Sequence, residues 1–363
     1  MNSSIKFNYI IIVVILTTFT ACADYLSDNN TKTGSARIGL PGGVNVLNSE
    51  ITNAKSRSTL SNIVPDIHNS TVMGGENPLF CRYTTTPGIV THKNSGNNNV
   101  TANTRGIAIT TNSFYDSYSL YSYVYPSDRT WAASTLITGK KYDETYFDEE
   151  VKLSKSWTTA EYWPSAQERC AFFAYAPYHA KGLSKFSTGG WPTFHYSVPT
   201  DVTEQSDLLV TKNEIPANAS SYGNIDISGG FNKPDSITFD HACTAIRFAI
   251  GDQMAPGVIK KITINNVYST GDYNYETESW SNVDSLKTFT LTQDFEIKSG
   301  EHNKILNNDD NIFMMIPQKL PSDATMEITV NDGTEHVIKA YIRNDEWKKG
   351  YTVTYYLSTA KVG

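Results

Sequence analysis

The chain has 363 residues, of which 39% are hydrophobic and 18% charged, so it is long enough for two domains and is not a disordered tail. Lys and Arg total 30 against 37 for Asp and Glu, and this net charge of −7 argues against nucleic acid as a partner, which needs clustered cationic side chains. The 22 tyrosines and 15 phenylalanines, with abundant Thr, Asn and Gly, favour strands joined by tight turns over helices. We therefore predict an all-β fold.

Residues 1–21 have the composition of a secretory signal peptide. Lys6 precedes an apolar run over residues 9–19, which is too short to span a bilayer comfortably. The run ends at Thr20, Ala21 and Cys22, where small residues precede a cysteine, as a lipoprotein signal peptidase requires. We predict cleavage before Cys22 and lipidation of Cys22. The alternative is an ordinary cysteine with cleavage after another small residue.

The next stretch, residues 22–36, is polar and lacks any period, so we predict a flexible tether. One acyl chain anchors a protein only reversibly, and the several chains of a bacterial lipoprotein would hold this one at the membrane. After the tether, short apolar runs predict strands at residues 37–47, 106–111, 171–175 and 207–211, separated by long polar insertions.

Residues 237–250 carry an unusual pattern. Their apolar positions are odd-numbered through Cys243 and even-numbered from Ile246. A strand with period two cannot change phase unaided, so we predict a bulge or a switch between sheets near Thr244. His241 lies in this strand, and we predict a structural role in which it donates to the backbone.

The last third alternates most clearly. Residues 326–330 and 338–342 alternate on either side of Asn331, Asp332, Gly333 and Thr334, which predicts a hairpin. Further strands are predicted at residues 262–264, 289–297 and 351–357, and a buried strand at 311–316. The sequence between residues 211 and 237 is rich in Asn, Ser, Gly and Pro. We place a domain boundary there, between an N-terminal domain (37–228) and a C-terminal domain (229–363), both β-sandwiches.

Three cysteines follow the tether: Cys81, Cys170 and Cys243. Their number allows at most one disulfide, and neither a CxxC pair nor a zinc-like histidine spacing accompanies them. Cys170 and Cys243 lie in apolar runs, which favours small buried thiols. We predict no metal site and no cofactor.

The sequence also lacks the common catalytic motifs: there is no GxSxG, HExxH, P-loop or dinucleotide fingerprint. Acidic clusters at residues 143–150 and 308–311 lack EF-hand spacing and are interpreted as solvated loops. Trp131, Trp191 and the tyrosines of residues 121–125 would suit stacking on sugar rings, but aromatic side chains of this kind also fill β cores. No catalytic residue is predicted.

Several segments, in this order along the chain, together resemble the fimbrillin family, the Mfa-like branch of type V pilus subunits. They are Thr20-Ala21-Cys22; Trp157 and Tyr162-Trp163-Pro164 leading to Phe172-Phe173-Ala174-Tyr175-Ala176-Pro177; Asp207-Leu208-Leu209-Val210; Phe239-x-His241 and Ile246-x-Phe248; Ile262-x-Ile264-x-x-Val267, Gly271-x-Tyr273 and Trp280; and Trp347-x-x-Gly350-Tyr351-x-Val353-x-Tyr355.

The resemblance implies two tandem transthyretin-like β-sandwich domains, export as a lipidated precursor and transit to the outer membrane. It also implies that proteolysis after an arginine frees the first strand of the N-terminal domain, and that a strand of the next subunit fills the groove. Here the first strand is predicted at residues 37–47 and the cut after Arg57, with Arg37 and Arg105 as rival sites. The last strand alternates as a donor would, but it would equally complete its own sheet.

The function expected from the resemblance is a structural and adhesive subunit of a cell-surface fimbrium, without enzymatic activity. Its partners would be other subunits, the outer membrane through acyl chains, and a host or bacterial surface ligand. The sequence leaves open whether the subunit is a stalk, anchor or tip. Two alternatives remain: an outer-membrane lipoprotein that binds surface glycans, and a lipoprotein hydrolase.

Overall fold

The computed structural model describes residues 38, 43–47, 66–69, 78–89, 114–134, 144–152, 154, 160–162, 164, 167–186, 191–211, 237–308 and 311–359. This part of the chain forms strands β1 to β19, with one short helix, α3 (Trp131–Ser134), and one 3-10 turn, η4 (Val202–Glu204). The predicted all-β fold is therefore confirmed. Among the residues just given, no helix has the length and apolar character needed to cross a membrane.

The first sheet has six strands, in the order β1, β10, β9, β6, β4, β5. In chain order these are β1 (Val44–Val46), β4 (Ser117–Pro126), β5 (Phe147–Lys152), β6 (Glu168–Ala176), β9 (Leu209–Thr211) and β10 (Ile237–His241). Both faces are buried: Leu120 and Val124 of β4 belong to one apolar cluster, and Tyr121 and Tyr123 to another. Because neither face meets solvent, β4 has almost no alternation.

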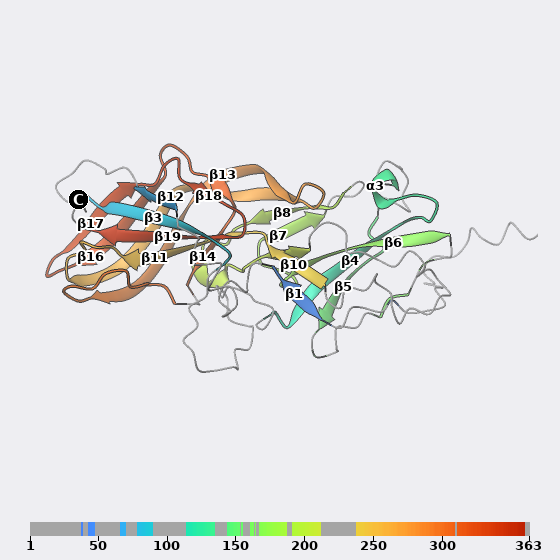
Figure 1. Ribbon diagram of the computed structural model, residues 1–363, viewed down its shortest axis with the longest axis horizontal. Helices are drawn as coiled ribbons and strands as arrows, with labels where there is room; N and C mark the ends of the chain where they lie inside the picture. Colours follow the sequence, from blue (N-terminus) through green and yellow to red (C-terminus); the bar gives the residue numbers. More distant parts are fainter. Residues whose placement is uncertain are drawn as a thin grey trace, which may run out of the picture.

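The second sheet has five strands, in the order β14, β11, β19, β3, β2. They are β2 (Asp66–Asn69), β3 (Phe80–Pro87), β11 (Thr244–Ile250), β14 (Phe313–Met315) and β19 (Tyr351–Ser358). The last strand, β19, lies between two neighbours: it runs parallel to β11 and antiparallel to β3. Figure 1 shows β3, β19 and β11 side by side toward one end of an elongated molecule, with β4, β5 and β6 toward the other.

The third sheet is built around β12 (Gly257–Asn274). The first half of β12 pairs with β16, its second half pairs with β8, and its other edge pairs with β13 along nearly its whole length. The remaining strands are β7 (Leu183–Phe186), β8 (Thr193–Ser197), β13 (Ser279–Ile297), β16 (Thr325–Asn331) and β17 (Glu335–Tyr341), and a separate pair is formed by β15 (Gln318–Lys319) and β18 (Glu346–Trp347). The predicted domain boundary lies between residues 228 and 229. Two strand pairs, β3–β19 and β8–β12, each join one strand before this boundary to one strand after it, so the boundary stays a prediction.

Two predictions from periodicity are confirmed. The chain leaves the first sheet after β10 and enters the second at Thr244, which explains the change of apolar phase in residues 237–250. The predicted hairpin is β16–β17, paired from Thr325 and Tyr341 to Asn331 and Glu335. At its turn, Gly333 has a φ of 121°, a conformation that side chains other than glycine rarely adopt.

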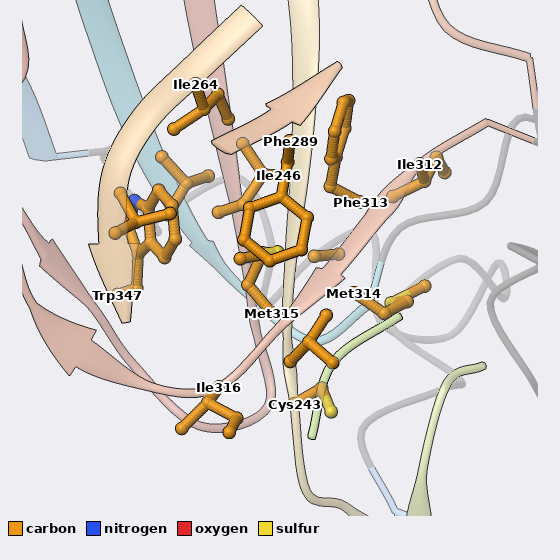
Figure 2. Close-up of a cluster of buried hydrophobic side chains, with 14 of the residues drawn as sticks. Cys243, Ile246, Ile264, Phe289, Ile312, Phe313, Met314, Met315, Ile316 and Trp347 are labelled. Carbon is orange, nitrogen blue, oxygen red and sulfur yellow. The ribbon is translucent and has the colours of Figure 1, made fainter. Parts of the chain in front are cut away.

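One apolar cluster runs through the interior from the aromatic side chains of β4 and β6 to the strands of the second and third sheets. Figure 2 shows part of it, where Ile246 of β11, Phe289 of β13 and Met315 of β14 point toward one another. A second, smaller cluster covers the other face of the first sheet. The first strand, β1, contributes to this second cluster.

Candidate functional site

In the described part of the chain, β1 ends the strand order of the first sheet, and its pairing with the sheet is short. It pairs in parallel with β10 over three residue pairs, from Val44 with Ile237 to Val46 with Phe239. The Ile237 N–H donates to the Gly43 carbonyl at 3.0 Å. Parallel pairing is slightly less stable per residue than antiparallel pairing, so this is a weak strand contact. Figure 1 shows β1 beside β10.

The segment leading to β1 nevertheless buries apolar side chains. Ile38 and Val46 are each 2% exposed and belong to the smaller cluster. The N–H of Ile38 donates to the Glu161 carbonyl at 2.8 Å, and the neighbouring Tyr162 carbonyl accepts from the hydroxyl of Tyr146, next to β5. Ile38 therefore lies toward the β5 side of the sheet and Val46 toward the β10 side, and both contribute to the same buried face.

An aromatic group lies beneath β1. The rings of Phe114 and Tyr118 lie 5.0 Å and 5.5 Å from that of Phe239, which is the residue opposite Val46. All three rings are buried. If β1 left, it would uncover these rings together with the backbone groups of β10. An exposed apolar face beside an unpaired strand edge is the arrangement that accepts an added strand.

Val46 should contribute measurably to stability. We expect Val46→Ala to lower the free energy of unfolding by about 2 kcal/mol, because a buried valine loses two methyl groups. The matched control is Val337→Ala on β17, which is 49% exposed and should change stability by less than about 0.5 kcal/mol. Urea unfolding of both variants measures the difference, and equal effects would show that β1 is not packed as described.

Other described edges carry features that oppose strand addition. On β14, the Met314 N–H donates to the Gln205 side chain at 2.8 Å, and on β17 the Lys339 carbonyl accepts from the Leu79 N–H at 3.1 Å. Long β13 contains bulges, with Asn282 and Ser285 at φ of 50° and 61°. Bulges and covered backbone groups are common ways to block edge pairing. The acidic residues 148–150 of β5 also oppose edge pairing, because their charged side chains disfavour an added strand.

A buried pair of a histidine and an aspartate lies at the other end of β10. His241 Nδ1 is 2.9 Å from Asp207 Oδ1, and both side chains are fully buried. The structural role predicted for His241 is thus met by a carboxylate and not by the backbone. Cys243 lies two residues farther on, and burial, with a contribution from Asp207, raises the pKa of its thiol well above the usual range. A nucleophilic thiol needs a lowered pKa, so these three residues do not form a cysteine nucleophile.

A second His–Asp pair lies on the surface of the third sheet. His195 Nδ1 is 2.7 Å from Asp272 Oδ1, and Ser184 is opposite His195 on β7. The residue types are those of a serine hydrolase, but the side chains of His195 and Asp272 are 41% and 33% exposed. Within the described chain, no hydrogen bond joins Ser184 to His195. The base therefore has no bonded nucleophile, and we interpret the pair as a surface contact.

The structure places several residues singled out from the sequence. Cys81, Cys170 and Cys243 are buried and free, and burial raises the pKa of Cys170 to about 12. Trp131 is buried, and Trp191 packs against the same core, as do the tyrosines of residues 121–125. These aromatic side chains do not form an exposed sugar-stacking surface. Across the described ranges, no group of three or more His, Cys, Asp or Glu side chains is arranged to hold a metal ion.

Cys22, Arg57, Arg37 and Arg105 lie outside the described residues, as does the predicted strand 106–111. Lipidation and the position of the cut therefore stay predictions. Phe114 and Tyr118, which lie near β1, could not be singled out from the sequence, because aromatic residues in this segment show no clear period.

Comparison with solved structures gives several distant similarities. A candidate cell adhesion protein from Bacteroides ovatus is 13% identical, with a TM-score of 0.38, covering 66% of this chain and 85% of that one. A candidate cell adhesion protein from Bacteroides uniformis is 14% identical, with a TM-score of 0.35, covering 68% and 91%. The tip fimbrial protein Mfa3 from Porphyromonas gingivalis is 10% identical, with a TM-score of 0.25, covering 67% and 94%.

A search of curated proteins gives no match. The family model described as fimbrillin-like, however, matches residues 91–362, which is most of the sequence. The chain therefore belongs to the fimbrillin-like family.

Proposed function

We propose that this protein is a structural and adhesive subunit of a type V pilus at the cell surface. It is exported as a precursor lipidated on Cys22 and reaches the outer membrane. Cleavage after Arg57 releases the first strand, and a strand of the next subunit takes its place on β10. The protein has no enzymatic activity in this proposal, and its two sandwiches are transthyretin-like.

The observation that carries the proposal is the combination found at β1. Three residue pairs join β1 to the sheet, yet its segment buries Ile38 and Val46 over one face. A short strand with little backbone pairing separates more readily than a long one. Exposing the apolar face that it leaves to water is unfavourable in free energy. The vacated position would therefore need a replacement strand.

The last strand has the opposite character. β19 pairs with β11 through six residue pairs and with β3 through eight, and most of its side chains are buried. To donate β19, the subunit would have to divide its own second sheet. We propose that β19 stays in its own subunit, and that the donor is another segment.

Strand exchange is tested by limited proteolysis. Purified protein cut by a trypsin-like protease should give ladders on unboiled gels, whereas Arg57→Gln should stay monomeric. Arg37→Gln and Arg105→Gln are the matched controls and should polymerise like the wild type. Complete cleavage without ladders would contradict strand exchange, and tight oligosaccharide binding by the same sample would favour the glycan-binding alternative.

Lipidation is tested separately. Cys22→Ser should shift the protein from the membrane fraction to the supernatant and abolish labelling by a clickable palmitate analogue. An unchanged fractionation and unchanged labelling would show that Cys22 is not the anchor.

A further inference from the structure

Strands β10 and β11 follow each other directly along the chain. On one side of this stretch, β1 pairs with its first half and β19 pairs with its second half. β1 pairs in parallel with β10, and β19 pairs in parallel with β11. The opposite edge carries β9 and then β14, both antiparallel. β1 and β19 thus follow each other along the same edge of this stretch, which passes from one sheet to the next, and the C-terminal end of β1 points toward the beginning of β19.

Between β1 and β19, this edge is covered by the side chains of Asp240 and Lys349 and by the loop at Gly350. Ile237 and Phe239 direct their backbone groups toward β1, so the alternate residue His241 faces the same edge. The His241 N–H donates to the carboxylate of Asp240 at 3.0 Å. Asp240 in turn lies 3.4 Å from Lys349 Nζ.

The loop that carries Lys349 is itself fixed to the strand. The N–H of Gly350 donates to the Cys243 carbonyl at 2.8 Å, and Thr244 Oγ1 donates to the Lys348 carbonyl at 2.8 Å. The side chains of Asp240 and Lys349 are only 18% and 24% exposed. The edge is therefore occupied continuously from Asp240 to the start of β19.

We propose that Asp240, held by Lys349, is a register stop for the strand that pairs with β10. This strand is the protein's own β1 and, on the proposed function, the replacing strand of a second copy. A strand displaced by two residues toward β19 would need the His241 N–H as a hydrogen-bond donor, but this N–H already donates to the side chain of Asp240. The displaced strand would also collide with the loop at Gly350. A displacement by one residue would turn the apolar side chains outward.

The path of β1 agrees with such a stop. The N–H of Leu47 donates to the Phe239 carbonyl at 2.8 Å, and Leu47 itself is no longer in the strand but in a turn. A replacing strand would also have to end its pairing opposite Phe239 and turn away there. Asp240 and Lys349 thereby determine which register of an incoming strand buries its apolar side chains over Phe239 and Tyr118.

Engineered disulfides within the full chain test the stop. The pair Asn45→Cys and Thr238→Cys reports the observed register, because these residues are opposite each other. The pair Gly43→Cys and Thr238→Cys reports a displacement of two residues toward β19. Mass spectrometry after thiol capping measures both cross-links, each with Asp240 intact and with Asp240→Ala.

With Asp240 intact, only the first pair should cross-link efficiently. Asp240→Ala should raise the displaced cross-link about tenfold, since a charge-assisted hydrogen bond is lost. The matched control is Asp294→Ala, which removes an exposed partner of Lys260 and should leave both cross-links unchanged. Lys349→Ala keeps the carboxylate and should give an intermediate result.

Equal displaced cross-linking with and without Asp240, in folded protein, would overturn the stop. The second arm rests on the proposed function: in protease-cut oligomers that carry the photoreactive residue p-benzoyl-phenylalanine at position 238, ultraviolet light should join one donor residue to position 238 by C–H insertion, and Asp240→Ala should add a second. Absence of oligomers in both forms would contradict strand exchange, while the intrachain cross-links alone decide the register stop.

Discussion

Asp207→Ala is expected to lower the free energy of unfolding by about 3–5 kcal/mol. The Asp207 and His241 side chains are fully buried and 2.9 Å apart, so removing the carboxylate leaves a buried imidazole without its acceptor. Breaking a buried pair from one side is costly because the remaining polar group is not rehydrated.

The double variant Asp207→Ala with His241→Ala should lose less stability than the sum of the two single variants, because it leaves no unpaired partner. The matched control is Asp272→Ala, which breaks the exposed pair with His195 and should cost less than about 1 kcal/mol. Urea unfolding at pH 7 measures the wild type and the four variants, namely Asp207→Ala, His241→Ala, the double variant and Asp272→Ala. If Asp207→Ala cost no more than Asp272→Ala, the buried pair would not stabilise the crossing between the sheets.

Local pattern was enough to predict the elements whose two faces differ. The β16–β17 hairpin alternates on both sides of a turn in which Asn331 Oδ1 accepts the Gly333 N–H, so the pattern and the turn chemistry agree. The switch between sheets was visible near Thr244 for the same reason: a change of phase is a local event. These features depend only on residues that are close in sequence.

Strands buried on both faces were predictable only in part: the apolar runs at residues 171–175 and 311–316 indicated β6 and β14, but β4 was not predicted. β4 has aromatic or apolar side chains on both faces, so it carries no period-two signal. β3 pairs with β19, more than 250 residues away, and Tyr83 opposite Tyr355 has no local marker. Long-range pairing of this kind depends on which faces of the strands meet in three dimensions. The spacing of apolar residues within one segment does not indicate its distant partner.

The candidate site was predicted in part. The sequence indicated a first strand within residues 37–47, and the structure pairs Val44–Val46 with β10. It did not indicate the parallel direction, or that Ile38 is buried near Glu161 while Val46 is buried beside β10. The partner of His241 was also missed, because Asp207 is 34 residues away and nothing in its own segment indicates a contact with His241.

The contribution of Asp345 to the stability of the protein should fall as pH rises from about 4 to about 8. The residue is 8% exposed, and its carboxylate accepts a hydrogen bond from the Tyr355 hydroxyl at 3.1 Å. Trp347 Nε1 donates to the same hydroxyl at 3.1 Å. Burial raises the pKa of Asp345 to about 7, although its hydrogen bonds from Tyr355 and Tyr83 act in the opposite direction.

The sign follows from proton binding. Between the pKa of an unfolded aspartate, near 3.9, and about 7, the folded chain holds a proton on Asp345 that the unfolded chain has released. This contribution to stability is complete below pH 3.9 and is lost as pH rises through about 7. A shift of three pKa units corresponds to at most about 4 kcal/mol.

Asp345→Asn should remove this dependence, because an amide keeps an acceptor for Tyr355 and never ionises. Relative to the wild type, the variant should gain up to about 4 kcal/mol at pH 8 and little at pH 4.5, measured by urea unfolding at several pH values. Asp294→Asn, at an exposed position, controls for the loss of one negative charge and should follow the wild-type curve. All other titrating groups are common to the proteins and cancel in the difference. Parallel curves for Asp345→Asn and the wild type would mean that Asp345 ionises in the folded protein as it does in water, and that its burial beneath Tyr355 does not control stability.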